Sequence, residues 1–277
     1  LTHTAFVADE TMRFISANQT QPFLVIAGFY SPHSPWITPQ RYLDMYNPNE
    51  LTLPEIPDKW KAPSGRTPIA EAELRSVRQG YYGMVSEVDH YVGRILDHLD
   101  KTGRSDNTII FFVSDHGEYL GDYHTYGKGP PGNDCITRVP CLVRWPDGVK
   151  QGTTVTGLTE AIDVVPTILD LCSIPIPKSV QGRSLRPALE GDATYSRTCA
   201  LTESVHNSSI RTDTHRYVCY KDGRELLFEH ESDPNEYVDL SQNDDAAETL
   251  AEIRLLMIQK MLETNLIVVE FLVNKVN

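Results

Sequence analysis

The order of three segments constrains the fold more than any other feature. Phe23–Tyr30 and Asn107–Val113 are continuous apolar runs of strand length, and Ala70–Lys101 lies between them. In that middle segment apolar residues recur every three or four positions, which is typical of one buried face of a long helix. Continuous apolar strands joined through a helix are typical of a parallel sheet covered on both faces. We therefore predict an α/β protein with a mostly parallel sheet flanked by helices.

The pattern changes after Gly191. Short strand-like runs separated by turn residues replace the long elements, over Cys199–Glu203, Ser209–Arg211, His215–Lys221 and Glu225–Glu229. A helical pattern follows from Asp245 to about Glu263. Such runs are typical of a small antiparallel sheet. We expect two domains: residues 1–191 as an α/β domain carrying the candidate site residues described below, and residues 192–277 as a small α+β subdomain.

The charge of the chain limits its partners. Lys and Arg number 25 against 38 Asp and Glu, which gives a formal net charge of −13. An acidic chain has no general attraction for nucleic acid or for anionic lipid, so neither is an expected partner. An anionic substrate would need a local positive group, such as a metal ion or a lysine. No apolar run reaches the roughly 18 to 20 residues of a membrane span.

The most informative motif follows the strand that ends at Val113. It reads Ser-Asp-His-Gly-Glu, so Asp115 and His116 leave the carboxyl end of the strand together. Ligands of open parallel sheets bind at that edge. A carboxylate oxygen and an imidazole nitrogen are also common ligands of divalent cations. From the dipeptide alone, an aspartate that caps a helix beside a solvated histidine is the commoner interpretation.

Two further segments carry groups suited to an anion. Lys128 lies between glycines, which allow the backbone to approach a ligand while the lysine supplies a positive charge. His33 lies in Pro-His-Ser-Pro-Trp36, directly after the Phe23–Tyr30 run, and the prolines restrict its backbone. A lone lysine or histidine in a loop usually has no such role. The position of His33 and Asp115 at one predicted sheet edge favours a common site.

Together these motifs resemble the sulfatase family of the alkaline phosphatase superfamily. The resemblance runs from about residue 5 to residue 262, in order. It includes Gln79–Arg94, Arg138–Pro146, Thr159–Leu169 and Asp233–Glu236. It implies an alkaline-phosphatase-like sheet and a sulfuric ester hydrolase that acts on a sulfated small molecule or glycan.

The resemblance also implies roles for individual residues. Asp115 and His116 would bind a divalent metal, for which Ca²⁺ is favoured, while Mn²⁺, Mg²⁺ and Zn²⁺ stay open because of the imidazole. Lys128 would contact the sulfate, and His33 would act as general acid for the leaving alcohol. Three weaker candidates would contact the substrate: Trp36, His124 and His206.

One part of the family pattern is missing. The family nucleophile is a Cys or Ser in Cys/Ser-x-Pro/Ala-x-Arg, converted to formylglycine, and no cysteine of this chain fits that motif. Two further metal-binding aspartates of the family are also absent. We therefore expect this chain to correspond to the C-terminal portion of a sulfatase and to be inactive alone. The missing N-terminal part, or a second copy, would cover the apolar surface left open.

Two other functions remain. Relatives that hydrolyse phosphonate monoesters or phosphodiesters use a very similar set of residues, so the motifs do not separate them from sulfatases. A non-catalytic sulfatase-like binding protein would also lack the nucleophile.

Overall fold

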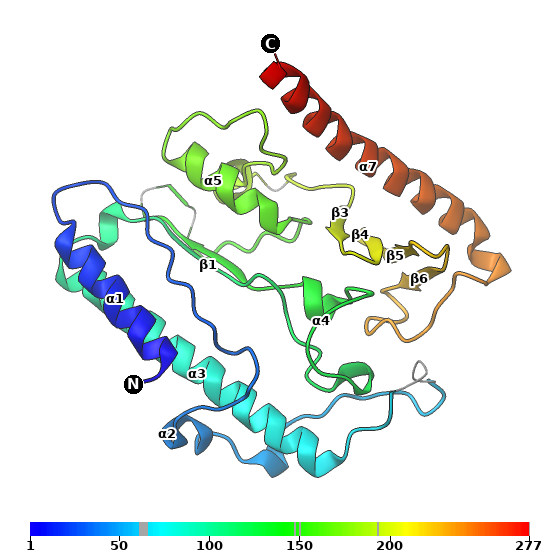
Figure 1. Cartoon of the computed structure of the whole chain (residues 1–277), viewed down its shortest axis with the longest axis horizontal. Helices are drawn as coiled ribbons and strands as arrows, with labels where there is room; N and C mark the ends of the chain where they lie inside the picture. Colours follow the sequence, from blue (N-terminus) through cyan, green and yellow to red (C-terminus); the bar gives the residue numbers. More distant parts are fainter. Residues whose placement is uncertain (61–65, 147, 150, 193, 277) are drawn as a thin grey trace. The chain divides into compact units, whose positions relative to one another are not determined.

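The computed structural model describes residues 1–60, 66–146, 148–149, 151–192 and 194–276, with residues 265–276 described by their backbone alone. Helices and two sheets alternate along the chain, which confirms the predicted α/β class (Figure 1). The chain divides into two compact units that interleave in sequence. The first unit comprises Leu1–Ile110, Glu118–Gly127 and Val143–Asp147, and the second comprises Phe111–Gly117, Lys128–Leu142 and Gly148–Asn277. The domain boundary predicted after residue 191 stays a prediction.

The first unit is built mainly from helices. α1 lies along the long helix α3 (Figure 1), and their contact buries Ala5, Ala8 and Tyr91. The Thr2 hydroxyl caps α1 by accepting a hydrogen bond from the Ala5 amide at 3.1 Å. The sequence predicts α3 from the apolar periodicity of Ala70–Lys101, and this helix is confirmed. The helical segments of this unit are α1 (His3–Ala17), α2 (Gln40–Leu43), η1 (Pro48–Glu50), α3 (Glu71–Lys101), η2 (Ser105–Asn107) and η3 (Asp122–His124).

The apolar run 23–30 differs from its prediction. The segment has no regular strand assignment, and its side chains alternate between half-buried and exposed. Phe29 packs on the core between α1 and α3, whereas Leu24 and Ile26 on the other side are 70% and 86% exposed. A strand requires a hydrogen-bonded neighbour, which the sequence of the strand itself does not supply.

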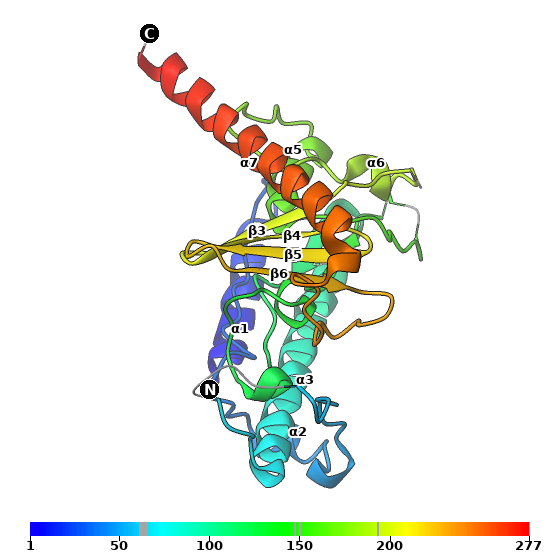
Figure 2. The same cartoon turned by 90° about the vertical axis from the view of Figure 1, so that its right-hand side faces the viewer.

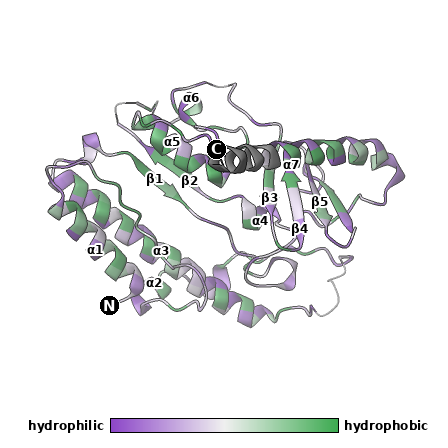
Figure 3. Cartoon of the chain, turned by 45° about the horizontal axis from the view of Figure 1, so that its top comes forward, coloured by the Kyte–Doolittle hydropathy of each residue, from purple (hydrophilic) through white to green (hydrophobic). Residues whose placement is uncertain are grey.

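The smaller sheet contains β1 (Ile110–Val113) and β2 (Cys141–Arg144), which are paired with each other. Both strands are predominantly hydrophobic (Figure 3). The prediction that the run ending at Val113 is buried on both faces is wrong for β1, because Phe112 and Val113 are 38% and 42% exposed. Leu142 of β2 is 60% exposed. Apolar composition establishes the strand but does not supply the layers that would cover it.

The second unit contains the predicted antiparallel sheet. Its four strands follow the order β3-β4-β5-β6, and α7 packs along the sheet (Figure 2). Ile210 and Leu227 of the sheet and Ile253 of the helix share one buried cluster. The strands lie within about two residues of their predicted positions, whereas the helix is longer than predicted. The elements are β3 (Ala200–Glu203), β4 (Asn207–Arg211), β5 (His215–Tyr220), β6 (Glu225–Glu229), η5 (Asp244–Ala246) and α7 (Ala247–Val276).

A buried ion cluster ties η4 (Ala161–Asp163) and the start of α5 (Val164–Leu171) to β3. The Arg197 guanidinium pairs with Glu160 at 2.5 Å and with Asp163, and all three side chains are almost fully buried. Glu160 also accepts a hydrogen bond from the Leu201 amide of β3 at 2.7 Å. The remaining helical segments of the unit are α4 (Asp134–Thr137), η4 (Ala161–Asp163), α5 (Val164–Leu171) and α6 (Arg186–Leu189).

Candidate active site

Asp115 and His116 lie directly after β1, as predicted. Asp115 Oδ2 is 3.5 Å from His116 Nε2, and the Asp115 side chain is 84% exposed. The loop is held by the Ser114 hydroxyl, which donates to the His116 carbonyl at 2.9 Å. His116 Nδ1 donates to the Gly117 carbonyl at 2.8 Å, which leaves Nε2 as the basic nitrogen. One carboxylate oxygen and one imidazole nitrogen are therefore presented side by side.

The position of this pair depends on Gly117. The Gly117 amide donates to the Ile136 carbonyl at 2.7 Å, so the loop lies directly against α4. A Cβ atom at residue 117 would overlap the Cys135 carbonyl oxygen. Only glycine allows this approach, which explains the Asp-His-Gly order physically.

His33 lies in a turn that orients its ring. Its Nδ1 lies 2.8 Å from both the Ser34 carbonyl oxygen and the Tyr30 hydroxyl. Because a carbonyl oxygen only accepts, the proton of neutral His33 lies on Nδ1 and the lone pair lies on Nε2. The Tyr30 ring also packs on the imidazole, with a centroid distance of 4.8 Å. This tautomer suits a histidine that exchanges a proton through Nε2.

The three weaker candidates have different surroundings. The Trp36 ring packs on Tyr126 at 5.1 Å, and its buried indole N–H has no acceptor among the described residues. His124 packs near Trp60 at 6.1 Å and has a left-handed backbone, with a φ of 52°. His206 is exposed in the turn between β3 and β4. Contact between these three side chains and a substrate therefore stays a prediction.

The candidate residues fall in both compact units. His33, Trp36 and His124 belong to the first, whereas Asp115, His116, Lys128 and His206 belong to the second. The structure brings Asp115 and His116 together. The convergence of His33 on this pair stays a prediction.

Sequence reasoning missed a buried polar cluster in the second unit. Ligand atoms of Asp134, His230 and Glu236 lie within 4.8 Å of one another, the one such group of three found among the described residues. Arg216 pairs with Glu236 at 2.6 Å and also with Asp134. Asn133 donates to the same Glu236 carboxylate at 2.6 Å. Asn133 and Glu236 are 103 residues apart along the chain, so no local spacing could reveal that they meet.

The cluster is better explained as an ion network than as a metal site. Burial disfavours the charged form of Glu236, but His230 and Arg216 outweigh burial and lower the pKa of this carboxyl. Burial also opposes ionisation of Asp134, and the Arg216 and Arg211 guanidinium groups lower its pKa. A cation placed there would meet the buried Arg216 guanidinium, which repels it.

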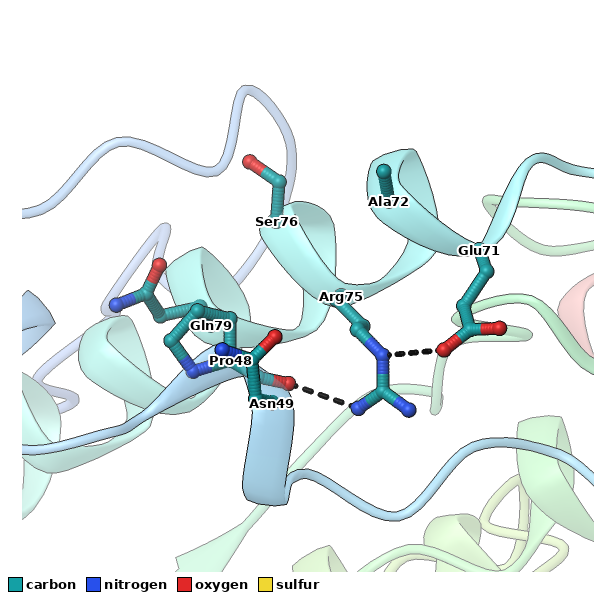
Figure 4. Close-up of a pocket in the computed structure, with 7 residues that line it drawn as sticks. All are labelled: Pro48, Asn49, Glu71, Ala72, Arg75, Ser76 and Gln79. Atoms are coloured by element: carbon teal, nitrogen blue, oxygen red, sulfur yellow. Dashed lines mark hydrogen bonds and ion pairs between the residues drawn. The ribbon is translucent and has the colours of Figure 1, made fainter.

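A surface pocket of about 560 Å³ lies elsewhere in the first unit, between η1 and the start of α3 (Figure 4). Its Arg75 donates to Glu71 at 2.7 Å and to the Pro48 carbonyl at 2.9 Å. Gln79 donates to the Leu43 and Tyr46 carbonyls. These polar groups are already paired, and no candidate catalytic residue lines the pocket. The loop after β1 therefore stays the candidate active site.

Two family models match the chain. The sulfatase model matches residues 2–174, and the model of the C-terminal part of N-sulphoglucosamine sulphohydrolase matches residues 133–264. Among curated relatives, an arylsulfatase of Clostridium perfringens is 30% identical and is matched over 93% of this chain and 57% of its own length. The N-acetylglucosamine-6-O-sulfatase of Bacteroides thetaiotaomicron is 38% identical over 151 residues, which is 50% of this chain and 27% of the relative.

Solved structures agree on the fold. A phosphonate monoester hydrolase from Silicibacter pomeroyi superposes with a TM-score of 0.87 at 28% identity, over 95% of this chain and 60% of that protein. The fold and the Asp-His-Gly site therefore define a protein of the alkaline phosphatase superfamily. Within that superfamily, the chain belongs to the sulfatase family. The chain spans 57% of the length of the Clostridium perfringens arylsulfatase and 60% of the length of the Silicibacter pomeroyi enzyme.

Proposed function

We propose that the protein containing this chain hydrolyses sulfate esters. The observation that carries the proposal is the Asp115–His116 pair at the carboxyl end of β1, inside the region matched by the sulfatase model. The substrate class is a sulfated small molecule or glycan. The likeness to an N-acetylglucosamine-6-O-sulfatase supports the glycan.

The side chains of Asp115 and His116 are suited to supply part of a metal site. Asp115 supplies an exposed carboxylate, and His116 supplies Nε2 beside it. Sulfatases are metal-dependent in general, and we infer that Ca²⁺ is held here, with Mn²⁺, Mg²⁺ and Zn²⁺ as alternatives. Ca²⁺ takes six to eight oxygen ligands, so two side chains are an incomplete set. When bound, the ion supplies positive charge for the sulfate oxygens and the nucleophile.

Lys128 and His33 have separate roles in the proposed reaction. The Lys128 ammonium would bind the sulfate oxygens and stabilise negative charge that develops on them. In its imidazolium form, His33 would donate the Nε2 proton to the oxygen of the leaving alcohol and would end as the neutral tautomer whose Nδ1 proton is directed to the Ser34 carbonyl. Trp36, His124 and His206 would contact the alcohol portion of the substrate.

The nucleophile is proposed to come from outside these 277 residues. It would be a formylglycine on an N-terminal part of the family fold, which would also cover the exposed Leu24 and Ile26. We therefore expect the 277-residue chain alone to be inactive.

Hydrolysis of phosphonate monoesters is the second candidate. It is favoured by the superposition on the Silicibacter pomeroyi enzyme, which is 28% identical to this chain. A sulfatase-like protein without catalysis remains the third.

The test uses full-length protein with an aryl sulfate and an aryl phosphonate monoester. We expect the sulfate ester to be hydrolysed faster, and K128A to lower kcat/KM by about 10²- to 10³-fold, because one charge-stabilising donor is lost. Chelation should abolish turnover, and Ca²⁺ should raise the melting temperature of wild type but not of D115N. Faster phosphonate hydrolysis would select the second candidate, and the absence of turnover with both esters would contradict hydrolysis of these substrates.

A further inference from the structure

One loop joins the Asp115–His116 pair to Lys128, and hydrogen bonds close it at its base. The loop runs from Glu118 to Gly127. The Tyr119 amide donates to the Gly127 carbonyl at 3.0 Å. The Glu118 carboxylate accepts from the Gly127 amide and, at 3.2 Å, from the Leu120 amide. The Glu118 side chain and one backbone hydrogen bond therefore tie the end of the loop to its beginning.

The loop maintains an unfavourable backbone. Leu120, Tyr123 and His124 all have left-handed conformations, with φ values of 46°, 54° and 52°. A non-glycine residue adopts this conformation at a cost in free energy, so such conformations persist only where the surroundings enforce them. Arg78 of α3 donates to the Leu120 carbonyl oxygen at 3.2 Å. The Glu118 carboxylate accepts from the Leu120 amide at the base of the loop.

The closed base limits the position of Lys128. Peptide bonds connect Gly117 to Glu118 and Gly127 to Lys128, and consecutive Cα atoms are about 3.8 Å apart. With Tyr119 hydrogen-bonded to Gly127, the Cα atoms of Gly117 and Lys128 are at most about 17 Å apart. The same chain, fully extended, would span roughly 36 to 40 Å. The closed base restrains Lys128 from its N-terminal side, and on its C-terminal side the chain returns to the same loop where the Ile136 carbonyl accepts from the Gly117 amide.

We propose that Glu118 is a positioning residue for Lys128. Its carboxylate fixes the Gly127 amide, and thereby the backbone that delivers the lysine to the anion. The proposal rests on the proposed function, because it assigns Lys128 to the sulfate or phosphonate group. Glu118 itself does not touch substrate in this assignment.

The test compares E118Q, E118A and the control E71A in full-length protein. The glutamine of E118Q keeps an oxygen that accepts from the Gly127 amide, whereas the alanine of E118A has no acceptor. Glu71 is a comparable surface carboxylate, 67% exposed and paired with Arg75 one helical turn away. We expect E118A to lower kcat about 10- to 100-fold with little change in KM, E118Q to stay within about threefold of wild type, and E71A to have no effect.

A double-mutant cycle separates positioning from an independent role. In the K128A background, E118A should cause less than about a twofold further loss, because the group that Glu118 positions is already gone. A further loss of roughly tenfold or more would overturn the proposal. The melting temperatures of all variants show whether they are folded.

Hydrogen exchange tests the same tie without activity. Peptides covering residues 119–130 should exchange faster in E118A than in wild type and at the wild-type rate in E118Q. Equal exchange in E118A and wild type would overturn the proposal. If wild type hydrolyses neither ester, the proposed function fails, and the exchange measurement still decides whether Glu118 holds this segment.

Discussion

At the scale of single residues, the contact between Gly117 and the Cys135 carbonyl oxygen leaves no room for a side chain. We expect G117A to destabilise the fold by about 1 to 3 kcal/mol or more, because a Cβ would force α4 away from the loop. Urea denaturation measures the change. Gly93 is the matched control, since nothing lies within 4 Å of a Cβ there, inside α3. G93A should raise stability by up to about 1 kcal/mol, and equal effects of the two variants would contradict the contact.

The buried Glu236 carboxylate predicts a pH dependence of stability. Its pKa is lowered in the folded protein because His230 and Arg216 outweigh the penalty of burial. Its contribution is therefore present above the unfolded-state pKa of about 4.3 and is lost as the pH falls through the folded-state pKa. We expect E236Q to cost roughly 1 to 3 kcal/mol at pH 7, because Arg216 loses one of its two carboxylate partners and keeps Asp134.

Denaturation of wild type and E236Q between about pH 7 and pH 3 checks this expectation. The difference in unfolding free energy should shrink below about pH 4. E10Q is the control, because Glu10 is exposed and pairs with Arg13 within its own helix turn. Its effect should stay within about 0.5 kcal/mol. A constant difference for E236Q at all pH values would contradict the role of its charge.

At the scale of elements, the stability of the antiparallel sheet depends on one face of α7. Ile253 is 5% exposed against Ile210 and Leu227, whereas Ile258 on the same helix is 55% exposed. We expect I253A to cost about 2 to 4 kcal/mol and I258A less than about 0.5 kcal/mol, because only the first leaves a cavity. Thermal unfolding of both variants measures the contrast, and similar losses would indicate that α7 packs differently.

The elements also show where sequence patterns suffice. α3 and the four strands of the larger sheet lie close to their predicted positions, because residues a few positions apart create their apolar periodicity. The predicted strand over residues 23–30 has no regular strand assignment. Its apolar composition shows that the segment is suited to a buried strand. A strand also needs a neighbour with which to form hydrogen bonds, and the segment's own sequence does not supply one.

At the scale of the whole molecule, exposed apolar residues predict self-association of the isolated chain. Leu24 and Ile26 are 70% and 86% exposed on the outer side of their segment. We expect the isolated chain to bind a hydrophobic dye and to sediment as a concentration-dependent mixture. Both effects should decrease in the L24K/I26K variant, with stability changed by less than about 0.5 kcal/mol.

A second variant shows whether the outer side is responsible. Phe29 packs inward on the core of α1 and α3, so F29K should lower the free energy of unfolding. It should not reduce dye binding by the native chain. Unchanged dye binding and sedimentation in L24K/I26K would show that another surface causes association. None of the helices in the described part of the chain is long and apolar enough to cross a membrane.

By itself the sequence determined the local elements and the order of the Asp115, His116 and Lys128 motifs, because these depend on residues that are neighbours along the chain. Only the tertiary structure decided that Arg216 pairs with Glu236, and that the Glu118 carboxylate holds the Gly127 amide. Such pairings depend on how the chain closes its loops. A hydrogen bond between distant residues leaves no periodic pattern in the residues between them.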